Sequence, residues 1–252
     1  MKRPAPWLLT VQRTERITPN MQRITFGGDG LAGFPEDIAS AYLKIAFPDQ
    51  GADAVRSYTV RSFDPESLEL EVDFVVHGDH GIASGWAERA SAGDTVKAGG
   101  PGPKKLLDLS GDWFLVVGDM SALPAIGANL ARLPTHAKGY ALIEVLDEAD
   151  RQPLEVPANV AVQWIVNPNP EDSAGFVMDA VCALEWFDGR CEAWVAGELD
   201  TVRAVRSYLK SERGLTRQQL YASSYWQFGS TDEQHRVAKK ADQDVVESES
   251  GA

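Results

Sequence analysis

The sequence predicts a two-domain protein of the β plus α/β class, with an antiparallel barrel over residues 1–108 and an open parallel sheet over residues 109–252. Three observations lead to this prediction. The chain has 252 residues, whereas a single domain usually has about 100–200. Between residues 7 and 105, polar and apolar side chains alternate with a period of two. From residue 112 onward, apolar segments alternate with segments of helical period, as in a parallel sheet flanked by helices.

The first half is predicted to contain six short strands. The clearest covers residues 68–76, where apolar residues alternate with three acidic ones across a pleated strand. Five more segments with strand character are 7–16, 22–26, 42–47, 55–61 and 95–98. Six strands at this spacing are typical of a small barrel. A short helix is expected over residues 83–90, and the glycine- and proline-rich run 99–103 is expected to end the barrel.

The second half is predicted to alternate between buried strands and helices. Four apolar segments have the composition of buried parallel strands: 113–117, 140–145, 160–166 and 193–196. Helical period is found over 121–132, 174–186 and 200–213. In the last of these, Asp200 is a candidate N-cap and Gly214 suits a left-handed stop. A last strand is expected over 219–225, followed by a helix over 231–240 and a frayed acidic tail.

The charge and hydropathy of the chain disfavour two classes of partner. A formal net charge of -13 leaves no broad basic surface for nucleic acid or an anionic membrane. No apolar run approaches the roughly 18 residues of a membrane-spanning helix, so no membrane insertion is expected. The first ten residues have too short an apolar stretch for a signal peptide. We therefore expect a cytoplasmic protein.

The cysteines and histidines do not predict a bound metal. Cys182 and Cys191 match neither a C-x-x-C redox pair nor a zinc motif, and we expect two buried thiols. The four histidines have no metal-ligand spacing: His77, His80, His136 and His235. We expect no protein-bound catalytic metal.

The segment R-S-Y-T-V-R over residues 56–61 is the first candidate for a binding site. On a strand, Arg56 and Tyr58 share one face, while Thr59 and Arg61 share the other. FAD requires a cation for its pyrophosphate and a flat ring against its isoalloxazine, which Arg56 and Tyr58 could supply. Thr59, or its backbone, could lie near flavin N5. Taken alone, the segment is better explained as an ordinary solvated strand face, because a strand with an arginine and a tyrosine on such a face is common.

A second candidate is the start of the short helix. The run from Gly81 to Ser84 leads into that helix, where free backbone N–H groups, the helix dipole and the Ser84 hydroxyl could converge on an anion. An ordinary capped helix is the alternative. Because only one strand and its loop separate the two candidates, they favour a shared phosphate site.

Seven motifs occur in a fixed order along nearly the whole chain. They are R-S-Y-T-V-R from Arg56, E-V-D-F-V-V-H-G from Glu71, H-G-I-A-S-G-W-A from His80, A-G-D-T-V from Ala92, the glycine–proline run, G-D-M-S-A-L-P-A-I from Gly118 and Y-W-Q-F-G from Tyr225. This set resembles the siderophore-interacting proteins, which are FAD-dependent ferric-siderophore reductases related to the ferredoxin reductases. The resemblance implies a six-stranded antiparallel Greek-key barrel that binds FAD, followed by an α/β domain like a nicotinamide-binding half. It also implies an enzyme that passes electrons from NAD(P)H or a ferredoxin to ferric siderophores in the cytoplasm and releases Fe(II).

The resemblance also assigns residues to the cofactor. By position, those expected to contact or surround FAD are Arg56, Tyr58, Thr59, Val60, Arg61, Asp73, Phe74, Val75, His77, Gly81, Ala83, Ser84, Trp86 and Trp226. Tyr58 and Thr59 orient the flavin and are the expected catalytic residues. Trp226 would approach the flavin from the second domain, and a core tryptophan is the alternative.

Two departures from the family pattern concern the second domain. Gln227 stands where family members often carry arginine, so an ionic role there is in doubt. The loop from Gly118 lacks the G-x-G-x-x-G spacing, and Asp119 would repel phosphate. NAD(P)H and a ferredoxin therefore both stay open as electron donors.

An anionic ferric siderophore would require cations in this acidic chain. Lys44 lies on the strand face opposite Leu43 and Ile45, and Arg236 and Lys239 lie three residues apart on the predicted last helix. For each of the three, a solvated surface charge is the alternative. Two other functions also fit: a general NAD(P)H:flavin or ferredoxin reductase, and a ferric-siderophore-binding protein without turnover.

Overall fold

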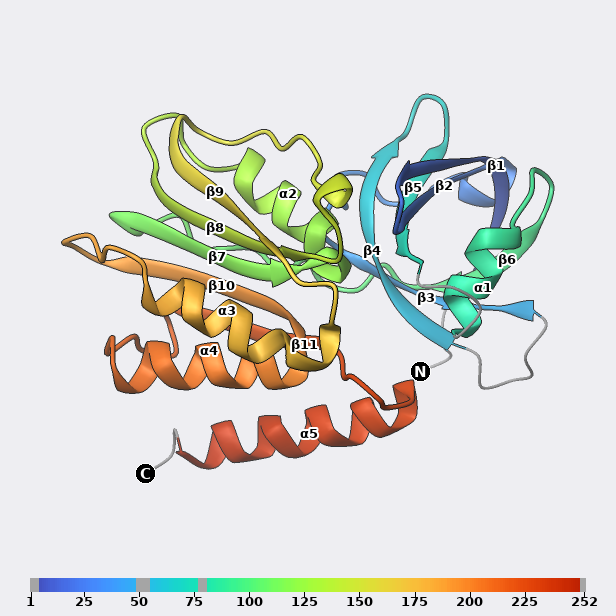
Figure 1. The fold of residues 1–252 in the computed structure, drawn as a ribbon. Helices are drawn as coiled ribbons and strands as arrows, with labels where there is room; N and C mark the ends of the chain where they lie inside the picture. Colours follow the sequence, from blue (N-terminus) through green and yellow to red (C-terminus); the bar gives the residue numbers. More distant parts are fainter. Residues whose placement is uncertain (1–4, 49–54, 77–80, 250–252) are drawn as a thin grey trace. The chain divides into compact units, whose positions relative to one another are not determined.

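The computed structural model describes residues 5–48, 55–76 and 81–249 and divides into two compact units (Figure 1). The barrel unit consists of Met1–Leu107, Met120–Thr135 and Asp147–Pro157. The sheet unit consists of Asp108–Asp119, His136–Leu146 and Ala158–Ala252. Two segments that follow the barrel in sequence are therefore part of the barrel unit. The proposed domain boundary after residue 108 stays a prediction.

Six antiparallel strands form a closed barrel, as the sequence predicted (Figure 1). They are β1 (Trp7–Thr18), β2 (Met21–Gly27), β3 (Tyr42–Ala46), β4 (Val55–Asp64), β5 (Glu69–Val75) and β6 (Thr95–Gly99). The order around the barrel is β1-β2-β5-β4-β3-β6, so β2 pairs with β5 and not with β3. Helix α1 (Ile82–Arg89) lies between β5 and β6 in the chain.

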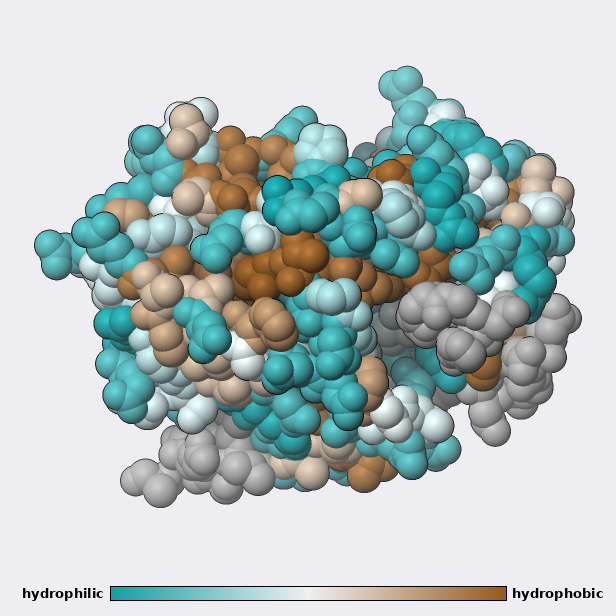
Figure 2. All heavy atoms as spheres, in the orientation of Figure 1, coloured by the Kyte–Doolittle hydropathy of each residue, from teal (hydrophilic) through white to brown (hydrophobic). Residues whose placement is uncertain are grey.

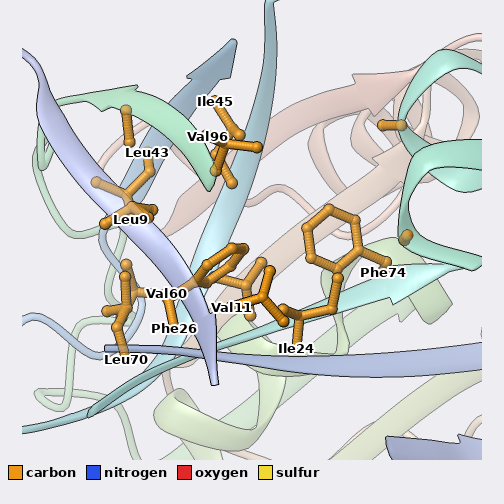
Figure 3. Close-up of a cluster of buried hydrophobic side chains, with 14 of the residues drawn as sticks. Leu9, Val11, Ile24, Phe26, Leu43, Ile45, Val60, Leu70, Phe74 and Val96 are labelled. Carbon is orange, nitrogen blue, oxygen red and sulfur yellow. The ribbon is translucent and has the colours of Figure 1, made fainter. Parts of the chain in front are cut away.

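The barrel is filled by the apolar side chains of alternate strand residues. Ten of them point into the interior in Figure 3: Leu9, Val11, Ile24, Phe26, Leu43, Ile45, Val60, Leu70, Phe74 and Val96. Each is at most 2% exposed. Burying one such side chain stabilises the fold by about 1.5–3 kcal/mol. The period of two in the sequence is thus the direct cause of the closed barrel.

The sheet unit contains a five-stranded parallel sheet, which confirms the second half of the prediction. Its strands are β7 (Trp113–Asp119), β8 (Lys138–Val145), β9 (Asn159–Val166), β10 (Cys191–Glu198) and β11 (Leu220–Trp226), in the order β11-β10-β7-β8-β9. Every residue of β7 and β10 is buried, as central parallel strands require. Helices α3 (Ser173–Cys182) and α4 (Leu199–Ser211) share one apolar core with the sheet.

The remaining helical elements are short, apart from the last one. Helix α2 (Leu123–Ala131) belongs to the barrel unit and follows the 3-10 turn η3 (Met120–Ala122). Three further 3-10 turns are η1 (Asp29–Leu31), η4 (Glu148–Asp150) and η5 (Pro170–Asp172). The last helix, α5 (Asp232–Glu249), is the longest. Among the described residues, no helix has the length and apolar character needed to cross a membrane.

Two predictions about helix ends are wrong. Helix α4 begins one residue before Asp200, and its N-cap is Glu198, whose carboxylate accepts hydrogen bonds from the backbone N–H groups of Asp200 and Thr201. Helix α5 continues past residue 240, where a frayed tail was expected. It does so because Asp242 accepts hydrogen bonds from Arg203 and Arg206 of α4 at 2.7–3.0 Å. The predicted left-handed stop at Gly214 is confirmed by its φ of 68°.

The prediction of two buried thiols is half wrong. Cys191 begins the central strand β10 and is buried, and burial raises the pKa of its thiol to about 12. Cys182 is the last residue of α3 and is exposed. The exposed phenylalanine Phe176 also belongs to α3, so one side of this helix carries apolar surface. Figure 2 shows several brown hydrophobic groups among the teal polar side chains of the visible face.

Candidate functional site

Four aromatic rings meet at one end of the barrel interior, and we call them the aromatic group. Tyr58 of β4 lies 4.3 Å from Phe74 of β5, between ring centroids, and Phe47 lies 5.2 Å from Trp86 of α1. Phe74 and Trp86 are 6.1 Å apart, which joins the two pairs. Three of the predicted residues, Tyr58, Phe74 and Trp86, are therefore neighbours. The ring of Phe47, which follows β3, was not predicted.

Exposure distinguishes the members of the aromatic group. The side chain of Phe74 is fully buried and that of Trp86 is 8% exposed, so both support the site from within. Tyr58 is only partly buried, so part of its ring reaches the surface. Val60 is also fully buried and belongs to the barrel core. Of the aromatic side chains predicted in the barrel, Tyr58 is thus the one best placed to contact a flat ligand.

A charged group lies on the neighbouring strands. Asp73 of β5 accepts two hydrogen bonds from Arg23 of β2, at 2.7 and 3.1 Å, and one from Arg61 of β4 at 3.2 Å. The Asp73 side chain is completely buried, whereas a third of the Arg61 side chain remains exposed. Burial lowers the pKa of Arg23, but its hydrogen bonds with Asp73 and the Asp73 charge outweigh this and raise the pKa overall. Asp73 therefore holds two arginines in place, and its charge is already matched.

Arg56 lies on the same strand as Tyr58. Cross-strand pairing sets Arg56 opposite Ile45 and Tyr58 opposite Leu43, so both are on the face of β4 that continues into the barrel core. Arg56 is partly buried, and its Nη1 donates a hydrogen bond to the carbonyl of Val55 at 3.0 Å. The predicted sharing of one face by Arg56 and Tyr58 is confirmed. Thr59 is 9% exposed and follows them on the other face.

The N-terminus of α1 follows β5 in the chain order. Gly81 is the N-cap with extended backbone, and among the described residues no side chain caps this helix end. Ala83 and Ser84 are buried in the first turn, and Val75 is the partly buried last residue of β5. The predicted residue His77 lies outside the described residues. The first N–H groups of α1 have the orientation that favours an anion.

In the sheet unit, Trp226 lies at the carboxyl end of β11 and is partly buried. Its indole Nε1–H donates a hydrogen bond to Asp119 Oδ2 at 2.8 Å, at the carboxyl end of β7. The same oxygen accepts the backbone N–H of Glu198 at 2.9 Å. The residue pattern does not predict this contact, because Trp226 and Asp119 are 107 residues apart in the chain.

A third carboxylate, Glu144, lies at the same edge of the sheet. It accepts hydrogen bonds from Ser173 Oγ at 2.5 Å and from Asn167 Nδ2 at 2.7 Å. Burial raises the pKa of Glu144, and the charges of Asp119 and Glu198 add to this, although the two hydrogen bonds oppose it. The carboxyl edge of a parallel sheet is where open α/β folds bind nucleotides. Here that edge carries acidic side chains that already have protein partners.

The three candidate cations for the substrate differ in their surroundings. Lys44 is exposed on β3, opposite in direction to the buried Leu43 and Ile45, as predicted. Arg236 is exposed and lies 3.6 Å from the carboxylate of Glu233 on the same helix. Lys239 turns toward β11 instead, where its Nζ donates to Ser223 Oγ at 2.9 Å and to the carbonyl of Ser224.

Two family models match the chain and together cover both units. The model described as siderophore-interacting FAD-binding domain matches residues 10–55 and 53–105. The model described as siderophore-interacting protein matches residues 111–229. The first contains the aromatic group, and the second contains Asp119 and Trp226.

Full-length relatives agree with these models. The ferric vibriobactin reductase ViuB of Vibrio cholerae is 34% identical and is aligned over 92% of this chain and 93% of its own length. The NADPH-dependent ferric-chelate reductase of Escherichia coli is 28% identical over 86% of this chain and 91% of its own. Among solved structures, the siderophore-interacting protein SipS from Aeromonas hydrophila has a TM-score of 0.85 at 31% identity, covering 95% of this chain and 98% of SipS.

A more distant structure supports the fold alone. The ferredoxin-NADP+ reductase from Plasmodium falciparum is 14% identical, with a TM-score of 0.69 over 87% of this chain and 96% of its own. This chain therefore shares the fold of that reductase, a barrel followed in the chain by a parallel sheet.

Proposed function

We propose a function from the premise that this chain belongs to the siderophore-interacting protein family: it is an FAD-dependent reductase that passes electrons to ferric siderophores in the cytoplasm. The observation that carries the proposal is the match of the FAD-binding model to the barrel, together with a relative that is named a ferric vibriobactin reductase and is aligned over 93% of its own length.

The residues of the barrel fit FAD. A dinucleotide with a tricyclic ring requires an aromatic surface, cations for two phosphates and backbone donors. Tyr58 offers a partly exposed ring, and Arg56 and Arg61 are cations on the same strand. The start of α1, with Gly81 as N-cap and no capping side chain among the described residues, offers backbone N–H groups for a phosphate. These features support assigning the cofactor to this end of the barrel.

Each of these residues has a distinct task in the proposed site. Arg56 and Arg61 would neutralise the pyrophosphate, and the buried Asp73 would hold Arg61 in the required orientation. Tyr58 would pack on the flavin ring, supported from behind by Phe74. The hydroxyl or N–H of Thr59 would hydrogen-bond near N5. The side chains of Ala83, Ser84 and Trp86 would shape the pocket around the pyrophosphate and the adenosine.

Bound FAD would supply the redox chemistry, taking up two electrons from the donor and giving them singly to two Fe(III) ions. The chain's residues bind and orient the cofactor and the chelate, and no side chain acts as an acid or base in the transfer to iron. Each Fe(III) gains one electron and becomes Fe(II). The hard oxygen ligands of a siderophore hold Fe(II) less tightly, so the metal is released.

The electron donor in this proposal is NAD(P)H, because the E. coli relative is named for NADPH. The acidic carboxyl edge of the sheet is a poor place for the phosphates of that donor, as Asp119, Glu144 and Glu198 all lie there. A ferredoxin remains the competing donor. Mixing the anaerobic protein with each donor separately, and following the flavin absorbance, distinguishes the two.

For the ferric siderophore we propose that the exposed cations Lys44 and Arg236 attract the anionic chelate. Lys239 has backbone and hydroxyl acceptors on β11 and serves first to hold α5. Each cation can be tested separately.

The test of the proposed function is a spectrum of the purified protein, followed by anaerobic photoreduction and addition of ferric catecholate or hydroxamate complexes. We expect flavin absorbance, and its reoxidation with formation of Fe(II) when the chelate is added. A colourless protein that does not bind added FAD contradicts the proposal. Reduced flavin that leaves bound chelate oxidised indicates a binding protein, and equal rates with artificial acceptors indicate a general reductase.

A further inference from the structure

We propose that Asp119 is a positioning residue that fixes the indole ring of Trp226, and that the Glu198 carboxylate holds the same chain segment through the backbone N–H of Phe228. The inference concerns residues of the sheet unit only. Its consequence for the flavin rests on the proposed function and on the expectation, implied by the family resemblance, that Trp226 approaches the cofactor.

The first observation is the sharing of one carboxylate oxygen. Asp119 Oδ2 accepts the indole N–H of Trp226 at 2.8 Å and the backbone N–H of Glu198 at 2.9 Å. Asp119 is 8% exposed, so little water competes for these contacts. Hydrogen bonds to a charged acceptor are stronger than those between neutral groups. The ring of Trp226 therefore has a fixed orientation and not a choice of rotamers.

The second observation is that the backbone makes room for this carboxylate. Gly197 has a φ of +146°, and a Cβ built on it would lie 2.4 Å from Asp119 Oδ2. Any larger residue would push the carboxylate away from the indole. The β10–β11 pairing also shifts register between Gly197 and Glu198, which pairs Glu198 with Trp226. Gly197 and the register shift next to it leave the space that the Asp119 carboxylate occupies, and we call this space the socket.

The third observation is that Glu198 binds the chain just beyond Trp226. Glu198 Oε1 accepts the backbone N–H of Phe228 at 3.2 Å, two residues after Trp226. Its other oxygen caps α4 through the N–H groups of Asp200 and Thr201. The segment 226–228 is thus held at two points, once by the Trp226 side chain and once by the Phe228 backbone. Asp119 and Glu198, whose charges disfavour a phosphate, thus accept hydrogen bonds from N–H groups of the protein itself.

The indole N–H of Trp226 can be observed directly. A nitrogen–proton correlation spectrum of the full chain contains indole signals from seven tryptophans, and the signal lost in Trp226→Phe belongs to Trp226. In Asp119→Ala, we expect solvent exchange of this proton to accelerate about tenfold or more, as for loss of a hydrogen bond to a charged group. Asp119→Asn keeps an acceptor oxygen and should restore most of the protection. An unchanged Trp226 signal in Asp119→Ala overturns the inference.

A second variant tests the same contact while the carboxylate is kept. Gly197→Ala adds a methyl group that must displace Asp119, so the Trp226 proton should again exchange faster. The other six indole signals should stay in place in each variant, which shows that the protein is folded. If Gly197→Ala folds and leaves the Trp226 proton protected, the socket does not exist.

The flavin supplies an independent readout. With FAD bound, the visible circular dichroism of Asp119→Ala should change in the direction of Trp226→Phe, while Asp119→Asn should resemble the wild type. If the wild type binds no FAD, the proposed function fails, but the indole experiment still decides whether Asp119 positions Trp226. If FAD binds and its spectrum is identical in all four proteins, the indole is not positioned for the flavin.

Discussion

The two units use their buried carboxylates in different ways. In the barrel unit, Asp73 lies between Arg23 and Arg61, so that one acid holds two cations near the aromatic group. In the sheet unit, Asp119 and Glu198 accept hydrogen bonds from N–H groups of the protein's own chain. The first arrangement presents positive charge to a ligand, whereas the second completes the fold. We infer that phosphate recognition belongs to the barrel.

The same comparison can be made between two acids that each join two arginines. Asp73 does so in the barrel unit and Asp242 does so in the sheet unit, where its partners are Arg203 and Arg206. The local chemistry is nearly identical. If replacing Asp73 and replacing Asp242 change the affinity for FAD differently, the difference would therefore come from where the two residues lie.

The largest effect is expected for Asp73→Ala. It leaves Arg23 and Arg61 without their buried counter-ion, and breaking such a pair typically costs about 3–5 kcal/mol. We expect a loss of unfolding free energy of that size in denaturant titration, together with a loss of FAD. The Asp73→Asn variant should lose less unfolding free energy and less FAD, because its amide oxygen still accepts a hydrogen bond.

Asp242→Ala is the matched control for this prediction. Its side chain is 14% exposed against 0% for Asp73, so it should lose less stability and retain FAD affinity. Equal loss of FAD in both variants would show that the effect is one of stability and not of site geometry.

A smaller effect is expected for Arg56→Ala. If Arg56 meets the pyrophosphate, its removal deletes a charge-assisted hydrogen bond that contributes about 1.5–3 kcal/mol net. The FAD dissociation constant, measured by fluorescence titration, should rise by about ten- to a hundredfold. Arg13→Ala is a suitable control, because Arg13 is an exposed barrel arginine paired with Glu69. An unchanged dissociation constant in Arg56→Ala would refute the assignment.

The strands of both units show what could be predicted from the sequence. Alternation of period two predicted the barrel, and apolar runs predicted the parallel strands, because both signals are local and arise from burial. The face of β4 that carries Arg56 and Tyr58 followed from the same rule. Phe47 could have been found too, since it continues the buried face of Leu43 and Ile45.

What the sequence did not predict depends on partners that are far apart in the chain. Asp119 was interpreted by its charge, because its partner Trp226 is 107 residues away. The length of α5 was missed for the same reason, since Asp242 is anchored by arginines 36 and 39 residues earlier. Glu198 was missed as a cap because glutamate is not among the residues preferred at that position. In each case the pairing, and not the residue type, determines the role.

A still smaller effect is expected for Lys44→Glu. An exposed cation contributes about 0.2–1 kcal/mol to a surface ion pair, so the Michaelis constant for an anionic ferric chelate should rise by about two- to fivefold. The flavin spectrum should not change. Lys97→Glu, on the exposed face of β6, changes the same charge elsewhere on the barrel. If both variants give the same Michaelis constant, the effect is one of net charge and Lys44 has no specific part.

The smallest effect is a local one, at the contact between α5 and β11 in the sheet unit. His235 is buried, its Nε2 lies 2.9 Å from Ser224 Oγ, and Lys239 of the same helix reaches the neighbouring Ser223. Burial lowers the pKa of His235, and the Lys239 charge adds to this, although Asp232 opposes it. The unfolded segment therefore binds a proton more readily than the docked one. It follows that docking of α5 is strongest above the ordinary histidine pKa of about 6.5 and weakens as the pH falls below it.

Amide hydrogen exchange of residues 232–244, corrected for intrinsic rates, should reveal this weakening between about pH 7.5 and pH 5.5. His235→Gln keeps a hydrogen-bonding side chain that does not titrate, so its α5 should open to the same extent at both pH values. The thermal midpoint of the whole protein should change little, because the parallel sheet does not depend on this contact. If the pH dependence persists in His235→Gln, another group controls the helix. If it disappears, neutral His235 is the group that holds α5 against β11, whereas in the barrel unit the buried Asp73 holds Arg23 and Arg61 through their charges.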